Sequence, residues 1–198
     1  MKYLFSFTAS NAMLPEFIRI AELVHSGKPI NEINDQVLGK EKKATNKRQI
    51  QELKRRTESL TPKQIEVLTE GNIDEQKQIS HLALCKAYGI YRDFVIEVLA
   101  EKIKVFDHSL TDLDYNSFIS KKKMDHPELE ALAETTQKKV KQVIYRMLQQ
   151  VGIIDSVSNP AILSPSVQPK VETSIIEDNA EWFKCFFYTE EAIGNING

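Results

Sequence analysis

Cysteine, histidine and glycine are all scarce in this sequence, and their scarcity excludes several classes of site. The two cysteines, Cys85 and Cys185, have no second cysteine or histidine at metal-ligand spacing, and the four histidines are scattered singly. The seven glycines form no phosphate-binding loop, and neither a G-x-S-x-G nor a C-x-x-C motif occurs. The polar connector at residues 107–114 is interpreted as helix capping, because its spacing matches no calcium loop. We therefore expect a reduced protein with no metal, no cofactor and no catalytic role.

Long apolar runs are also missing. No stretch of about 18 uncharged apolar residues, the length needed to cross a bilayer, occurs. The opening residues, MKYLFSFTASNAM, carry one lysine and a short apolar part broken by Ser6 and Thr8, which is unlike a signal peptide. Hydrophobic residues nevertheless make up 41% of the 198 residues, which is enough for a buried core. We expect a cytoplasmic protein without a membrane partner.

Positive charge is concentrated in one part of the chain, although the formal net charge is -2. Residues 40–63 hold nine cationic and three acidic side chains, whereas residues 171–198 hold one cationic and six acidic side chains. The densest part is the basic stretch, Lys42 to Arg56, in which seven cations accompany a single acid, Glu52. Such a stretch can attract a polyanion even when the whole protein is slightly acidic.

Helical periodicity dominates the sequence, and the predicted fold class is all-α. Pro15, at a first-turn position, and Gly27, at a helix end, mark the limits of the first helix. In the first part of the chain, helices are predicted over residues 14–28, 31–40, 45–60, 61–71 and, broken near Tyr88-Gly89, 73–106. This part, residues 1–108, is predicted to form an N-terminal helical domain, followed by a C-terminal domain over residues 109–198.

The C-terminal domain has the element order of a DNA-binding fold. Three helices are predicted over residues 114–123, 126–133 and 136–151, and the turn at residues 158–160 predicts two short strands within residues 153–165. Three helices followed by a β-hairpin form a winged helix-turn-helix, whose third helix enters the major groove. A last helix contains the aromatic residues of segment 180–188. These either pack on the body of the protein or form a partner surface.

The helix that begins at Thr45 has two different faces. At about 100° per residue, the apolar positions from Ile50 to Leu60 fall in one arc, and cations occupy the opposite arc. That cationic arc is either a solvated outer face or a nucleic-acid-binding face, since arginine forks suit phosphate. Likewise, the helix over residues 136–151 is either an ordinary amphipathic helix or a recognition helix. The candidate nucleic-acid-binding residues are Lys42, Lys43, Lys47, Arg48, Lys54, Arg55, Lys121, Lys122, Lys123, Lys138, Gln142 and Arg146.

Four segments, in this order and at these separations, resemble the BrxA family of the bacteriophage exclusion (BREX) defence systems. They read SFTASNAMLPEFIRIAELVHSGK, ATNKRQIQELKRR, LALCKAYGIYRDFVIEVLAEK and TQKKVKQVIYRMLQQVGIID followed by ILSPSV, and together they span roughly residues 4–170. The resemblance implies an all-helical protein whose N-terminal part is similar to the NusB-type antitermination fold. It also implies a cytoplasmic, non-enzymatic role in phage defence and an ability to bind nucleic acid.

Residues and resemblance together predict a non-catalytic accessory protein that binds double-stranded DNA, with other BREX subunits as partners. One alternative is a protein-interaction scaffold whose basic face meets an acidic surface on another defence subunit. A second alternative is RNA binding, by analogy with the NusB fold. Few aromatic residues lie beside the basic helix, which counts against a stacking platform for single strands.

Overall fold

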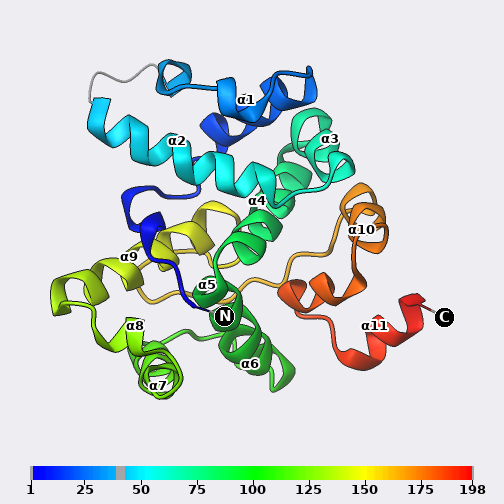
Figure 1. Cartoon of the computed structure of the whole chain (residues 1–198). Coiled ribbons are helices and arrows are strands. Elements are labelled where there is room, and N and C mark those ends of the chain that lie inside the picture. The colour runs from blue at the N-terminus through cyan, green and yellow to red at the C-terminus, as the bar shows by residue number, and fades with distance from the viewer. Residues whose placement is uncertain (1, 39–42, 198) are drawn as a thin grey trace.

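Helices form the regular structure of residues 2–38 and 43–197, the part of the chain that this computed structural model describes, with only the backbone described at residues 43, 44 and 197 (Figure 1). In chain order they are η1 (Ser6–Ala9), α1 (Leu14–His25), η2 (Ile30–Glu32), η3 (Asp35–Leu38), α2 (Lys43–Glu58), α3 (Pro62–Glu70), α4 (Ile73–Ala87), α5 (Gly89–Phe94), η4 (Val95–Leu99), α6 (Ala100–Lys104), α7 (Asp112–Lys123), α8 (Pro127–Glu130), α9 (Glu134–Gln150), α10 (Pro169–Ile176), η5 (Ala180–Phe186) and α11 (Glu190–Asn197). The predicted all-α class is confirmed.

Three helices, α3, α4 and α7, begin with a reciprocal cap made by a polar residue. Thr61, Asn72 and Thr111 each accept the backbone N–H three residues ahead, and the side chain at that position bonds back to the N–H of the cap. This reciprocal pattern satisfies two donors that the first helical turn would otherwise leave unpaired. The polar connector before α7 therefore serves as a cap, as the sequence predicts.

The break between α4 and α5 lies where the sequence predicts it. Tyr88 is extended, with φ -130° and ψ 104°, and α5 starts at Gly89. A Cβ atom at Gly89 would lie 3.3 Å from the ring of Tyr3, so the small residue lets the N-terminal segment pass close to the helix. From Gly89 the helix continues through a π-helical turn, η4, into α6.

The predicted helix over residues 31–40 is wrong for the described residues up to Leu38, which form the short 3₁₀ turns η2 and η3. The Asn34 side chain accepts the backbone N–H of Gln36 at 3.1 Å. A local side-chain bond of this kind competes with the helical hydrogen-bond pattern. The single helix predicted around residues 180–188 is also wrong, because the chain forms a 3₁₀ helix, η5, and then a separate helix, α11.

The predicted pair of short strands within residues 153–165 is wrong too. In the described chain this segment forms two isolated antiparallel bridges, Ser109 with Ala161 and Ile154 with Ile162, and no strand. Within the segment, the backbone N–H of Asp155 donates to the carbonyl of Ala161, whereas that of Ile162 donates to His108 outside the segment. Neither pairing continues into a ladder among the described residues. The order of three helices, α7, α8 and α9, is nevertheless present ahead of it.

Helix α4 lies at the centre of the molecule and contacts α1, α2, α3, α5, α10 and η5 (Figure 1). Helices α1 to α3 lie on one side of it, and α7 to α9 lie beyond α5. The buried hydrophobic residues form a single cluster that includes residues from both predicted domains. The division into residues 1–108 and 109–198, and the likeness to the NusB-type fold, stay predictions.

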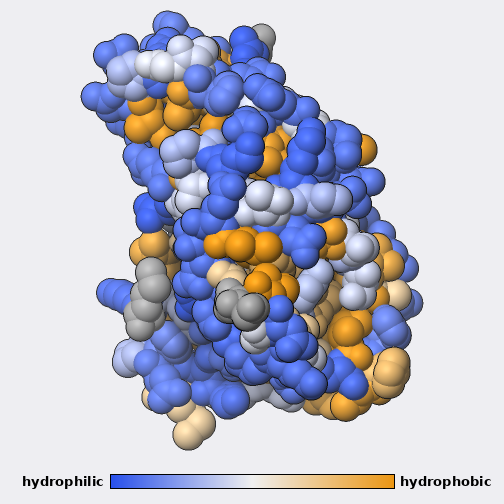
Figure 2. All heavy atoms as spheres, turned by 90° about the vertical axis from the view of Figure 1, so that its right-hand side faces the viewer, coloured by the Kyte–Doolittle hydropathy of each residue, from blue (hydrophilic) through white to orange (hydrophobic). Residues whose placement is uncertain are grey.

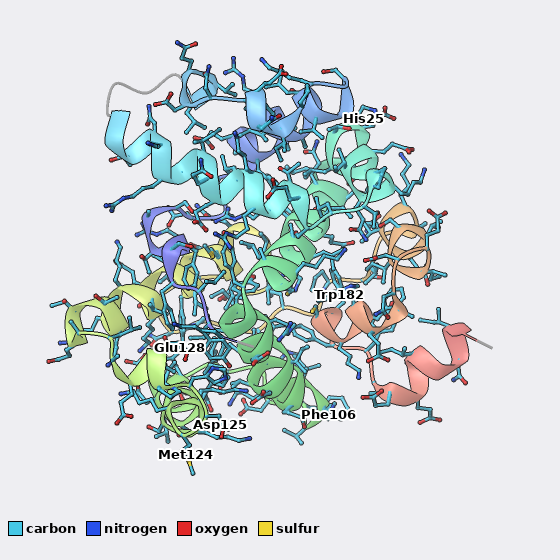
Figure 3. All side chains as sticks on the ribbon, in the orientation of Figure 1. His25, Phe106, Met124, Asp125, Glu128 and Trp182 are labelled. Atoms are coloured by element: carbon cyan, nitrogen blue, oxygen red, sulfur yellow. The ribbon has the colours of Figure 1, made fainter. Side chains whose placement is uncertain are left out.

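The aromatic residues near the C-terminus pack on the body of the protein. Phe183 and Phe186 are buried, and Trp182 faces α4, where Lys86 Nζ lies 5.5 Å from its ring centre (Figure 3). Figure 2 views the side that carries α10 and α11 and shows hydrophobic side chains in small groups among hydrophilic ones. No helix of the described ranges is both long enough and apolar enough to cross a membrane.

Candidate nucleic-acid interface

The amphipathic character predicted for the basic helix is confirmed in α2. Ile50 and Leu53 are buried, as is Leu60 just after the helix, whereas Lys47 and Arg48 are exposed. Within the described part of the chain, neither of these two cations has a carboxylate oxygen within 4.0 Å. Their charges are therefore available to a ligand.

Two further cations of this arc are partly engaged inside the protein. Lys54 Nζ donates to the backbone carbonyl of Asn31 at 3.4 Å, and Arg55 Nε lies 4.0 Å from Glu52 Oε2. Lys42 and the side chain of Lys43 lie outside the described residues. Among the described side chains of the predicted arc, Lys47 and Arg48 are thus the cations that make neither a hydrogen bond nor an ion pair with another described residue.

A cavity of about 580 Å³, cavity B, is lined by side chains of α2 and η1. Its lining residues are Ser6, Thr8, Ala9, Lys47, Arg48, Gln51 and Glu52. Glu52 is buried and accepts a hydrogen bond from Tyr88 Oη at 2.7 Å, so its carboxylate is committed to the interior. Lys47 and Arg48 remain as the cations at this cavity.

A second cavity of about 510 Å³, cavity A, lies on the other side of η1 and is bounded by the start of α1 and by α9. It is lined by Thr8, Ala9, Ser10, Asn11, Met13, Leu14, Pro15, Glu16, Gln49, Lys139, Val143, Arg146 and Gln150. Because Thr8 and Ala9 line both cavities, η1 is the ridge between them. The same ridge therefore has two cations of α2 on one side and two cations of α9 on the other.

The cations of α9 at cavity A also have no carboxylate partner among the described residues. Arg146 is exposed and has no hydrogen-bond or ion-pair partner among the described residues. Lys139 is exposed and donates to the neutral side chain of Gln142 at 3.2 Å. We call Lys47, Arg48, Lys139 and Arg146 the basic face. These four side chains come from helices about 90 residues apart, and none has a carboxylate partner within the described chain.

Comparison with known proteins identifies the family. The BrxA family profile matches residues 1–179. The chain belongs to the BrxA family. A relative named "BREX protein BrxA" from Bacillus cereus (strain H3081.97) is 29% identical over 90 residues, which are 46% of this chain and 45% of the relative, so the match spans less than half of that protein. The crystal structure of an uncharacterized protein from Magnetospirillum magneticum shares the fold, with a TM-score of 0.81 at 20% identity over 94% of this chain and 98% of that one.

In this BrxA-family chain, the predicted second basic element at the end of α7 lies away from the two cavities. Lys122 is 12% exposed, its Nζ lies 3.2 Å from Asp93 Oδ2, and it also bonds to Glu97. Burial alone would lower the pKa of Lys122, but the bonds to Glu97 and Asp93 raise it above its ordinary value. Lys121 is 77% exposed with Glu97 at 4.0 Å, and Lys123 is half-buried. The charge of Lys122 is therefore neutralised within the protein.

The predicted recognition residues of α9 lie at different places on the protein surface. Lys138 pairs with Glu134 at 2.6 Å and lines a different cavity, next to α7, whereas Arg146 lines cavity A. Gln142 is exposed beside Lys139. Lys139, which is not among the residues predicted from the sequence, shares the cavity with Arg146 because positions 139, 143, 146 and 150 follow one face of a helix. That spacing is the signal that could have identified it.

Apart from its cations, the interface offers hydroxyls and amides alongside apolar side chains, among them Met13, Leu14 and Val143 at cavity A. Hydroxyls of η1 and the following loop, and the amides of Gln49, Gln51 and Gln150, line the two cavities. Glu16 lies at cavity A as an acid. Across the two described stretches of chain, no group of three or more His, Cys, Asp or Glu side chains is arranged to hold a metal ion. The site is thus suited to holding an anion by charge and hydrogen bonds.

Proposed function

We propose that this protein is a non-catalytic accessory protein of a BREX phage-defence system, and that it binds duplex DNA through the basic face. Membership of the BrxA family, with a relative named as a BREX protein, supports the defence role. The observation that carries DNA binding is the convergence of four unpaired cations on the η1 ridge. Other BREX subunits are its proposed protein partners, and the cytoplasm, where host and phage DNA meet, is its proposed location.

Unpaired cations favour phosphate binding for a simple reason. A lysine that already touches a carboxylate must give up that contact to bind DNA, whereas an unpaired one only releases its own counterions and the condensed counterions of the DNA. Lys47 and Arg48 on one side of the ridge, and Lys139 and Arg146 on the other, are in the second situation. The ridge between them ends in the small side chains of Thr8 and Ala9, which allow a DNA backbone to approach closely.

The lining of the cavities favours a duplex over a single strand. Nonspecific single-strand sites combine cations with aromatic side chains on which the bases stack, each stack contributing about 1–3 kcal/mol. Among their described lining residues, cavities A and B contain no aromatic side chain. Contacts with phosphates position a protein on DNA without reading its sequence. We therefore propose binding with little dependence on base sequence.

The test is a fluorescence-anisotropy titration of a short labelled duplex at several salt concentrations. We expect Lys47→Gln/Arg48→Gln and Lys139→Gln/Arg146→Gln each to weaken binding. Each lost phosphate contact should make the plot of log affinity against log salt shallower by about 0.9. The matched control is Lys121→Gln/Lys138→Gln, which removes the same number of charges from exposed lysines beside Glu97 and Glu134.

Three results would contradict the proposal. Failure of the unmodified protein to bind at low salt would exclude DNA binding by this chain alone and favour the scaffold alternative. A control variant that weakens binding as much as the two test variants would mean that general charge, not the basic face, attracts DNA. Stronger competition by RNA or single-stranded DNA than by unlabelled duplex would overturn the choice of duplex.

A further inference from the structure

Arg56 belongs to the basic stretch, but its side chain points into the protein. It is 0% exposed. Its Nε donates to Tyr88 Oη at 3.0 Å, and its guanidinium lies 5.4 Å from the centre of the Tyr88 ring. Tyr88 Oη in turn donates to Glu52 Oε2 at 2.7 Å. The buried positive charge is therefore linked to a buried carboxylate through one phenol, which makes burial of both charges tolerable.

The remaining donors of Arg56 hold the loop that follows η1. Nη1 donates to the carbonyl oxygens of Asn11 at 2.8 Å and Ala12 at 2.9 Å, and Nη2 donates to Ser10 Oγ at 3.0 Å. One guanidinium thus fixes three consecutive residues. Its planar fork, with five N–H donors in fixed directions, suits this role.

Two glutamines complete the hold on the same loop. Gln49 Nε2 donates to the carbonyl of Ala9 at 3.4 Å, and Gln150 Oε1 accepts the backbone N–H of Ala12 at 2.9 Å. Each residue from Ala9 to Ala12 is therefore bonded to α2 or α9. The next residue, Met13, has φ +53°, a left-handed conformation that turns the chain into α1.

The clamped residues are also a wall of the candidate site. Ala9, Ser10 and Asn11 line cavity A together with Lys139 and Arg146. Arg56 itself lines neither cavity. It acts on the site only through the position of this wall.

We propose that Arg56 is a positioning residue for the DNA-binding site: it fixes the wall of cavity A and the η1 ridge relative to the cations of α9 without touching DNA. The inference rests on the proposed function. A binding surface that is fixed in advance loses less conformational freedom on association, and this preorganisation strengthens binding. Lysine cannot replace the arginine, because one ammonium cannot reach Tyr88, Ser10 and two carbonyls together.

The experiment compares Arg56→Lys, which keeps the net charge, with Val171→Ala, a buried change in α10 on the other side of α4. Both are titrated with the labelled duplex at a temperature where circular dichroism shows them fully folded. We expect Arg56→Lys to weaken binding about tenfold through lost preorganisation. We also expect faster hydrogen exchange at the amides of residues 9–12, whereas Val171→Ala changes neither quantity.

Tyr88→Phe provides a second test if Arg56→Lys does not fold. It removes the phenol that orients Nε but keeps the ring, and Tyr88 lines neither cavity. Because the same hydroxyl also holds Glu52 at cavity B, only weaker DNA binding together with faster exchange at residues 9–12 would again report on positioning. Unchanged affinity and unchanged exchange in the folded arginine or tyrosine variant, while the unmodified protein binds DNA, would overturn this inference alone. Weakening by Val171→Ala to the same extent would also overturn it, since the effect would then be general destabilisation. An unmodified protein that binds no duplex would overturn both proposals.

Discussion

Tyr3 lies flat against His126, with ring centroids 3.6 Å apart and ring planes 8° from parallel. Tyr3 Oη also donates to Asp93 at 2.7 Å, and its backbone N–H donates to Glu128 at 2.6 Å. These contacts attach the N-terminal segment to α5 and α8 just before η1 begins. The ridge at the candidate site is therefore held from both ends, by Tyr3 on one side and by Arg56 on the other.

We expect Tyr3→Ala to lower the free energy of unfolding by about 3 kcal/mol, because a buried aromatic ring and its stacking partner are lost. The matched control, Tyr3→Phe, keeps the ring and loses only the bond to Asp93, so its expected cost is about 1 kcal/mol. Urea denaturation followed by circular dichroism measures both. Equal losses for the two variants would show that the hydroxyl, and not the stacked ring, holds the segment.

A fall in stability between pH 6.5 and pH 4 is expected from His81. This side chain is fully buried, and burial lowers its pKa to about 4, although a hydrogen bond with the Cys185 carbonyl acts in the opposite direction. In that pH range the unfolded chain binds a proton at His81 and the folded chain does not, so stability decreases as pH falls. The maximum loss is about 3 kcal/mol, reached below pH 4.

Urea denaturation at a series of pH values tests this expectation. The control is His81→Gln, which cannot take up a proton and should flatten the profile between pH 6.5 and pH 4. A profile that keeps the same slope in the variant would assign the pH dependence to other groups. Asp107 and Glu128, whose pKa values are lowered to about 2 by their hydrogen bonds, would lose their contribution as the pH falls from their ordinary values of 3.8 and 4.5 toward 2, mostly below the window of His81.

The two cysteines should be unreactive in the folded protein. Cys85 and Cys185 are both 0% exposed. Burial is the main cause that raises the pKa of the Cys85 thiol, and its hydrogen bond with Cys185 raises it further. Since the thiolate is the reactive form, we expect neither residue to react with a disulfide reagent such as DTNB within minutes. Both should react at once in denaturant. Rapid labelling of the native protein would show that η5, which carries Cys185, opens readily from α4.

Much of α2 could be predicted from the sequence, but one residue could not. The apolar arc from Ile50 to Leu60 and the exposed Lys47 and Arg48 follow directly from a helical repeat of about 100° per residue. On the same repeat, Arg56 lies only about 40° from Leu60, at the margin of the apolar arc. Its charge supported the prediction that the basic stretch binds phosphate. In the structure its partners are instead Tyr88 and residues 10–12, which come close to Arg56 only when the chain folds.

Prediction of the candidate site from the sequence has the same limit. Sequence reasoning found Arg48 and Arg146 as separate candidates on two helices, but nothing in the pattern places η1 between them. That ridge depends on tertiary contacts of the N-terminal segment, such as the stacking of Tyr3 on His126. Local signals such as caps and periodicity are readable from sequence, whereas contacts between distant segments are not.

Lys122 offers a last prediction that separates a structural lysine from a DNA-binding one. Its ammonium lies between Asp93 and Glu97 and 5.7 Å from the centre of the Phe118 ring. Lys122→Gln leaves two neighbouring acids without this partner, so we expect a loss of about 1–3 kcal/mol in the free energy of unfolding. Lys121→Gln, at an exposed position, should change stability by less than about 0.5 kcal/mol.

The same two variants should bind duplex DNA as the unmodified protein does, with an unchanged salt dependence, because neither lysine belongs to the basic face. Denaturation and anisotropy titrations on one preparation measure both properties. If Lys122→Gln kept its stability and weakened DNA binding as much as Lys47→Gln/Arg48→Gln, the ion pairs with Asp93 and Glu97 would be exchangeable for phosphate. The end of α7 would then be part of the DNA-binding surface, and the basic face around η1 would be only one portion of it.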